Sequence, residues 1–132
     1  MKHQTLNPSA LAAPRGYSHI AIVPAGRQVH VSGQVAMNAS SEIVGPGDLE
    51  AQAEQVFTNL AHALAGAGAG LASMFKIVVY VVGLTPDKAT TVRNVRNKHL
   101  GNGPFPASTM VGVTALVHPD LLIEIEAIAT ID

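Results

Sequence analysis

Phe75-Lys76-Ile77-Val78-Val79-Tyr80-Val81-Val82 is a β-prone run with apolar residues at both of its alternating sets of positions. A strand that is apolar on both faces is covered on both sides by other parts of the protein, which is typical of a central strand. We therefore expect residues 73–82 to form a central strand. The segments before and after it have helical periodicity, so a sheet with packed helices is predicted.

Two helices are expected, one on each side of this strand in the sequence. Asp48 is a suitable N-cap for the first helix, which ends at Gly66, because an aspartate oxygen can accept hydrogen bonds from free amides in the first turn. The predicted buried stripe of this helix consists of Ala53, Val56, Phe57, Leu60 and Leu64. The second helix begins near Pro86, a residue favoured in a first helical turn. Its candidate inner face consists of Ala89, Val92, Val95 and Leu100.

The N-terminal part of the chain predicts a β-hairpin. Residues 17–23 and 28–35 are β-rich, and residues 24–27 form a predicted four-residue turn. In that register Ala21 lies opposite His30, and Tyr17 lies opposite Gln34. Strand alternation then gathers eight side chains, most of them polar or small, on one face: Tyr17, His19, Ala21, Val23, Gln28, His30, Ser32 and Gln34. The other face carries Ile20, Ile22, Val29, Val31 and Val35.

Two further strands are expected at the C-terminal end, over residues 106–117 and 121–131. In the second of these, Glu124 and Glu126 alternate with Ile123 and Ile125, so both carboxylates lie on one face. Like charges so placed repel each other, which calls for a reason. The element order ββ(β)αβαββ predicts a single α+β domain over residues 1–132, with a mixed or mostly antiparallel sheet and two helices on one face.

Composition limits the possible functions. Charged residues make up 13% of the chain, against about 25% in an average globular domain, and hydrophobic residues make up 48%. So little charge favours burial of part of the surface in an oligomer, although an alanine- and glycine-rich monomer has a similar composition. The chain has no cysteine, which excludes disulfides and cysteine zinc sites. No apolar run predicts a signal peptide or a membrane span, so we expect a cytoplasmic protein without a membrane partner.

The polar sheet face is the best candidate site. Its glutamates can move protons or orient water, and its hydroxyls can bind a small polar ligand. A solvated face or a polar subunit interface would have the same pattern. The six histidines lack metal-ligand spacing, so no metal is expected. The net charge of −1 and the lack of a basic run argue against nucleic acid as a partner.

Six segments in register resemble the RidA family, also called YjgF-like proteins or the endoribonuclease L-PSP family. They are Gly16-Tyr17-Ser18-His19, Val29-His30-Val31-Ser32-Gly33-Gln34, Gln52-x-x-Gln55-Val56-Phe57-x-Asn59-Leu60, Lys76-Ile77-Val78-Val79-Tyr80-Val81, Phe105-Pro106-Ala107-Ser108-Thr109 and Ile123-Glu124-Ile125-Glu126-Ala127-Ile128-Ala129. The resemblance spans residues 16–130. It implies a chorismate-mutase-like α+β fold and a homotrimer in which the sheets surround a central barrel, the helices lie outside, and a cleft forms between each pair of neighbouring subunits.

Deaminases of this family hydrolyse enamines and imines such as 2-aminoacrylate to 2-keto acids and ammonia, without a cofactor. By resemblance, Glu124 corresponds to a glutamate that positions the attacking water. Tyr17, Ser32 and Gly33 correspond to residues that line the substrate cleft. Arg93 falls, in a loose alignment, where the family has a pocket asparagine.

The family's substrate-binding arginine has no counterpart in this chain. Its position in a Pro-Ala-Arg-Ser motif is taken by Ser108, which is followed by Thr109. Serine cannot supply the charge that holds a carboxylate, so we expect little or no 2-aminoacrylate deaminase activity. Three functions remain open. They are hydrolysis of an imine, enamine or related small molecule with Arg93 or Arg96 in place of the lost charge, metabolite binding without catalysis, and ribonuclease activity or translation inhibition.

Overall fold

A computed structural model describes residues 3–23 and 25–132, so Pro24 of the predicted turn lies outside the described residues. Its main sheet has four strands in the order β3-β6-β4-β5. The β3–β6 and β4–β6 pairs are antiparallel, and the β4–β5 pair is parallel. The strand bounds are β3 Arg27–Val35, β4 Met74–Val82, β5 Ala107–Val113 and β6 Ile123–Ile131. The predicted mixed sheet and the central position of β4 are confirmed.

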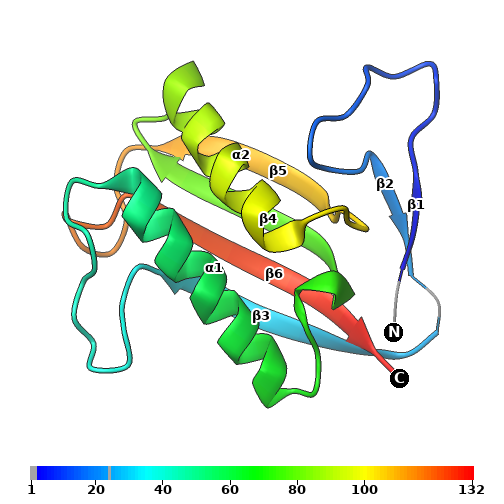
Figure 1. Cartoon of the computed structure of the whole chain (residues 1–132), viewed down its shortest axis with the longest axis horizontal. Helices are drawn as coiled ribbons and strands as arrows, with labels where there is room; N and C mark the ends of the chain where they lie inside the picture. Colours follow the sequence, from blue (N-terminus) through cyan, green and yellow to red (C-terminus); the bar gives the residue numbers. More distant parts are fainter. Residues whose placement is uncertain (1–2, 24) are drawn as a thin grey trace.

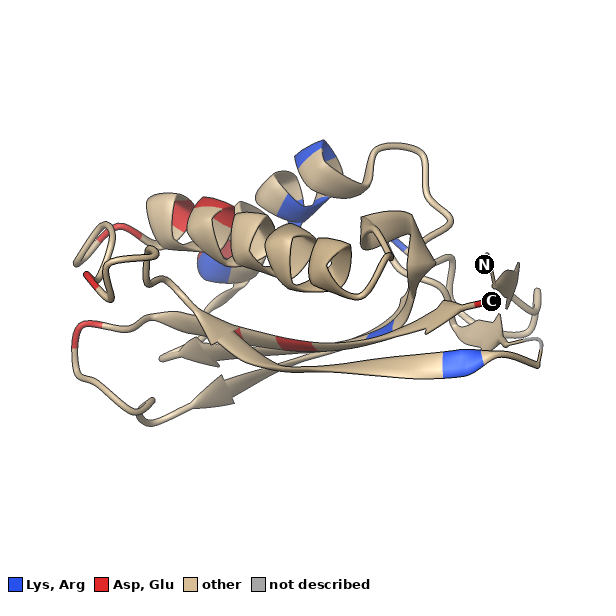
Figure 2. Cartoon of the chain, turned by 90° about the horizontal axis from the view of Figure 1, so that it is seen from below, with Lys and Arg blue, Asp and Glu red and all other residues tan. Residues whose placement is uncertain are grey.

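Both helices lie on the same side of this sheet, and its opposite face is open (Figure 1, Figure 2). The reason is the alternation along the two central strands. On β4, Ile77, Val79 and Val81 are at most 1% exposed, and on β6, Ile123 and Ile125 are fully buried. These side chains meet the apolar stripes of the helices, and the intervening residues of both strands point to the open face.

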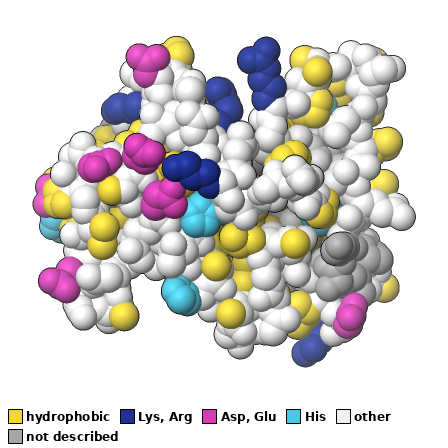
Figure 3. Space-filling model, viewed as in Figure 1, with side chains coloured by type: hydrophobic (Ala, Val, Ile, Leu, Met, Phe, Trp, Pro, Cys, Tyr) yellow, Lys and Arg dark blue, Asp and Glu magenta, His cyan; other side chains and the backbone are white. Residues whose placement is uncertain are grey.

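Helices α1 (Leu49–Gly66) and α2 (Pro86–Leu100) form as the sequence predicts. The Asp48 side chain accepts a hydrogen bond from the Ala51 amide, and the Thr85 side chain accepts one from the Lys88 amide. All five predicted stripe residues of α1 are fully buried. The charged side chains gather over the two helices (Figure 3), where Lys98 of α2 lies 3.5 Å from Glu54 of α1. A short 3-10 helix, η1 (Leu71–Ser73), leads into β4.

The predicted hairpin between residues 17–23 and 28–35 is wrong for the single chain. Strand β2 (Ile20–Ile22) pairs instead with β1 (Gln4–Leu6), with Ala21 opposite Thr5, in a separate two-stranded sheet. The segment before β2 is tied to the start of β5, because the Ser18 amide donates to the Pro106 carbonyl at 3.1 Å and Ser18 bridges to Ala107. The β1–β2 hairpin therefore lies beside the main sheet and not within it (Figure 1).

Phe57→Ala tests the core beneath the sheet. Phe57 is fully buried and its ring stacks on that of His99, with 5.3 Å between the ring centroids. We expect the free energy of unfolding to fall by about 3–5 kcal/mol, because the truncation loses apolar burial and leaves a cavity. Urea denaturation measures the change. Val117→Ala is the control, since Val117 is 84% exposed and its truncation is expected to cost less than about 0.5 kcal/mol. Equal losses in the two variants would contradict this description of the core.

Candidate functional site

A pocket of about 430 Å³ lies on the open face of the sheet. It is lined by residues of β3, β4, β5 and β6 and of the segment that follows β5: Gly33, Tyr80, Val113, Ala115, Leu116, Glu124 and Glu126. Glu124 lies opposite Tyr80, and Glu126 lies opposite Val78, two residues further along the pair. The two carboxylates therefore share the open face, as the sequence predicts.

Gly33 and Glu124 lie against each other in this pocket. A β-bulge interrupts the β3–β6 pairing between Val31 and Gln34, and Gly33 lies within it. The Glu124 carboxylate occupies the space in which a Cβ atom of residue 33 would lie. Only glycine permits this approach, because any other residue would displace the carboxylate. Two of the residues expected in the site are thus brought together by one strand irregularity.

Tyr80 and Glu126 form a polar pair that sequence reasoning missed. The Tyr80 hydroxyl donates a hydrogen bond to Oε1 of Glu126. This bond, followed by slight desolvation and by the charges of Glu126 and Glu124, raises the pKa of Tyr80 above its ordinary value. The phenol therefore stays protonated and remains a hydrogen-bond donor beside the carboxylates. The hydrogen bond also explains how two like charges can share one face of the sheet, since Glu126 is bonded to a neutral donor.

Tyr17 and Ser108 lie at a different place on the sheet. Ser18 bridges to Ala107 at the start of β5, so Tyr17 is close to that end, where its ring meets His19 edge to face. Ser108 pairs with Ile77, three residues before Tyr80 on β4, which is about 10 Å along a strand. Residues paired across parallel strands share a face, so Ser108 is on the helix side with Ile77. Within one chain these two residues are apart from Glu124.

The other predicted site residues divide between the two faces. Thr109 pairs with Val78, as does Glu126, so Thr109 is on the open face. Ser32 is exposed, and its carbonyl accepts a hydrogen bond of 3.0 Å from the Gln34 side chain. Gln34 was expected beside Ser32 on the polar face, and this prediction is wrong. The bulge shifts the register so that Gln34 pairs with the buried Ile125 and lines a pocket against α1.

Arg93 is exposed on α2, whereas Arg96 is 3% exposed. Nη2 of Arg96 donates to the Arg15 carbonyl at 3.0 Å, and its Nε is buried without a partner. Desolvation, and then the charge of Arg93, lowers the pKa of Arg96. Gly16 has a φ of +71°, and a Cβ atom there would meet the Arg96 guanidinium. Arg96 therefore brings a cation to the loop that carries Tyr17, near the start of β5.

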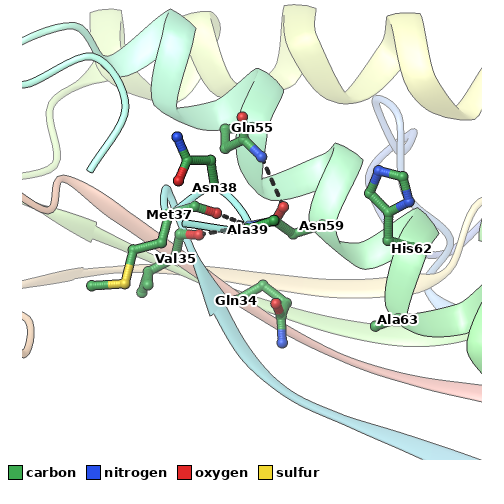
Figure 4. Close-up of a pocket in the computed structure, with 9 residues that line it drawn as sticks. All are labelled: Gln34, Val35, Met37, Asn38, Ala39, Gln55, Asn59, His62 and Ala63. Atoms are coloured by element: carbon green, nitrogen blue, oxygen red, sulfur yellow. Dashed lines mark hydrogen bonds between the residues drawn. The ribbon is translucent and has the colours of Figure 1, made fainter. Parts of the chain in front are cut away.

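A second pocket, of about 700 Å³, lies between α1 and the end of β3 (Figure 4). Its amide groups are engaged in structural hydrogen bonds. Nδ2 of Asn59 donates to the carbonyls of Val35 and Met37 at 3.0 and 2.9 Å, and Oδ1 of Asn59 accepts from Gln55 at 2.8 Å. These side chains hold the loop after β3 on the helix. The open-face pocket, with its paired carboxylates, is the stronger candidate for chemistry.

The described part of the chain contains neither a metal-binding cluster nor a membrane-spanning helix. Within residues 3–23 and 25–132, no three histidine, aspartate or glutamate side chains are grouped so that they could hold a metal ion. In the same residues, neither helix combines the length and the apolar character needed to cross a membrane.

The pKa of Tyr80 can be tested in a Tyr17→Phe background, since the chain has only two tyrosines. We expect phenolate absorbance to appear above the ordinary pKa of 10.0. Because the folded-state pKa is raised, the hydrogen bond stabilises the fold at lower pH, and this contribution is lost as the pH rises through the folded-state value. Adding Glu126→Gln should move the midpoint down, and an unchanged midpoint would contradict the assigned bond.

The sequence matches known proteins over nearly its full length. The model of a family described as endoribonuclease L-PSP matches residues 7–131. Over 110 residues, or 83% of each chain, the sequence is 30% identical to a 2-iminobutanoate/2-iminopropanoate deaminase of Dermatophagoides farinae. It is 32% identical to the protein of the same name from Bos taurus over 120 residues, which cover 91% of this chain and 83% of the other.

Solved structures match the fold as well. YyfB of Yersinia pestis, from the Rid family, is 39% identical, with a TM-score of 0.92 over 99% of this chain and 100% of its own. RidA from an Antarctic Psychrobacter species is 31% identical, with a TM-score of 0.72 over 97% of this chain and 99% of its own. The predicted YjgF-like α+β fold is thereby confirmed. With its two helices on one face of a mixed sheet and this run of matches, the chain belongs to the RidA family of YjgF-like proteins.

Proposed function

We propose that the open-face pocket hydrolyses an imine, an enamine or a related reactive metabolite. The observation that carries the proposal is the Glu124 carboxylate, which lies against Gly33 in a pocket that also holds the Tyr80 hydroxyl. A carboxylate at the wall of an open pocket can take a proton from water. The deaminase names of the relatives from Dermatophagoides farinae and Bos taurus support this class of reaction.

The proposed reaction uses the side chains of the chain and water. Glu124 accepts a proton from a water molecule while the water oxygen bonds to the imine carbon. Glu124 passes this proton to the imine nitrogen, which gives an amino alcohol. Glu124 then transfers the hydroxyl proton of that intermediate to the nitrogen, and ammonia leaves as the carbon–oxygen double bond forms, with Glu124 again a carboxylate. One imine and one water thus give one carbonyl compound and one ammonia. An enamine enters the same sequence after protonation at carbon.

The identity of the residue at position 108 limits the substrate. Charge-assisted hydrogen bonds contribute roughly 1.5–3 kcal/mol each, and Ser108 cannot make the two that an arginine makes to a carboxylate. We therefore propose poor turnover of 2-aminoacrylate. Arg96 can supply a positive charge near the same end of β5, because its guanidinium reaches the Arg15 carbonyl. Arg93 is the exposed alternative on the same helix.

Two other functions have weaker support. The absence of an arginine at position 108 favours metabolite binding without catalysis as the second candidate. Ribonuclease activity, which the name of the family model suggests, has little support from the charges. The net charge is −1, and Glu124 and Glu126 would repel phosphates from the pocket.

We also propose that the protein acts as a homotrimer with a small-molecule ligand in clefts between subunits. The low proportion of charged residues, 13%, supports a buried interface. The open face contributes to this argument, since Val111 of β5, opposite Tyr80, is 39% exposed. An apolar side chain at that place is suited to a subunit contact.

Glu124→Gln tests catalysis directly. Its amide cannot accept a proton, so we expect turnover of imines generated in situ to fall by about 100-fold or more. Ligand affinity, measured by calorimetry, should change little. Glu42→Gln, on an exposed loop residue, is the matched control and should keep the original rate. Unchanged turnover in Glu124→Gln would contradict the role of Glu124, and a lack of turnover in the unaltered protein would favour the non-catalytic function.

A comparison with an arginine-bearing relative tests the substrate preference. On 2-aminoacrylate we expect kcat/KM of this protein to be lower by about 100-fold or more, because both charge-assisted contacts are missing. An imine without a carboxylate serves as the control, since both proteins should hydrolyse it at similar rates. Comparable rates on 2-aminoacrylate would overturn this part of the proposal.

A further inference from the structure

The four-stranded sheet has two unlike edges. On the β5 edge, Ser18 covers the first residue of the strand. On the other edge, β3 pairs with β6 on one side, and no strand among the described residues pairs with its second side. β3 has nine residues and contains neither lysine nor proline. Proteins usually protect edge strands with these residues or by shortening the strand, because a long bare edge invites pairing with another strand.

The β1–β2 hairpin in turn exposes apolar side chains and one edge of β2. Of the six large hydrophobic side chains described as exposed, four lie within residues 6–22: Leu6, Leu11, Ile20 and Ile22. A two-stranded ribbon is marginally stable by itself, because it buries little apolar surface. β2 uses one of its edges to pair with β1, and its other edge has no ladder within residues 3–23 and 25–132.

The side-chain pattern of β2 fits the bare edge of β3. In the register predicted from the sequence, Ile20 lies opposite Val31 and Ile22 opposite Val29, while Ala21 lies opposite His30. Val29 and Val31 face the core but are only partly buried. The exposed isoleucines would therefore extend the apolar layer under the helices. Within one chain this pairing does not form, since Ser18 holds the start of the hairpin on β5.

We propose that the free edge of β2 pairs antiparallel with β3 of a neighbouring copy of this chain. The inference rests on the proposed homotrimer and names the strands that join its subunits. Each copy offers the hairpin at one edge of its sheet and β3 at the other, so the contact is head to tail. Such contacts are satisfied throughout only when the copies close into a ring.

This strand pairing completes the candidate site. Alternation from Ile20 and Ile22 puts Tyr17 on the open face of the neighbouring sheet, and the extra residue in the β3 bulge brings it opposite Val35, the residue that pairs with Glu124. The hydroxyl of Tyr17 thereby comes to the open-face pocket of another subunit, which it does not reach in its own. Arg96 comes close to the same pocket, because its guanidinium donates to the Arg15 carbonyl, just before Tyr17. In the assembly one site thus contains Tyr17 and Arg96 of one copy together with Gly33 and Glu124 of the next. In a single chain these two pairs lie apart.

Engineered disulfides test the pairing, and the natural chain has no cysteine to interfere. Ala21→Cys and His30→Cys are made as separate proteins, mixed, unfolded, refolded together and oxidised. Facing residues of antiparallel strands are about 4.5–5.5 Å apart at Cα, within the range that a disulfide spans. We expect a covalent dimer that contains one copy of each variant. Gln28→Cys and Ser32→Cys replace His30→Cys in parallel reactions, so that a register shifted by two residues is also detected.

Two controls make the outcome decisive. Ala21→Cys mixed with Glu42→Cys, on the exposed loop, should give no comparable dimer. The double variant Ala21→Cys/His30→Cys distinguishes pairing within a chain, which gives an internally bridged monomer, from pairing between chains, which gives linked oligomers. An internal bridge alone, or no bridge at any of the three β3 positions, overturns the proposal. Because no substrate is involved, this result leaves the hydrolytic function to be decided by Glu124→Gln.

Discussion

Burial of one face of β4 and β6 beneath the two helices is the constraint on which the other features depend. Side chains alternate along a strand, so each residue fixed in the core directs its neighbours to the opposite face. Ile123 and Ile125 are fully buried, and Glu124 between them must point away from the helices. Tyr80, between Val79 and Val81, is directed in the same way. The core thus positions the polar groups of the open-face pocket.

The sequence was sufficient for features that depend on local periodicity. The buried stripe of α1 and the alternation around Glu124 follow from spacing alone, because each is set by the geometry of one element. The partner of β2 was not predictable in this way. Its pairing depends on a competition between β1 and β3, and β1 has only three residues, Gln4–Leu6, too few to give a pattern. Gln34 was misplaced for a related reason, since the bulge beside it arises from the register with β6.

The candidate site was predictable only in part. Family resemblance singled out Gly33 and Glu124, and the structure places them in contact. The bond between Tyr80 and Glu126 requires knowledge of how β4 and β6 are paired, which neither strand contains by itself. The structural role of Asn59 likewise depends on the carbonyls of Val35 and Met37, more than twenty residues earlier in the chain. Interactions between distant segments limited the prediction at each of these points.

The contact between Gly33 and Glu124 also affects how the protein can evolve. Because the carboxylate occupies the side-chain space of residue 33, the two positions cannot vary independently. A side chain at 33 would push the end of the flexible Glu124 side chain aside, and a shorter acid at 124 would leave a gap that a methyl group at 33 would fill. Each change alone would therefore disturb the site more than the two changes together. Such coupling links the evolution of the two positions.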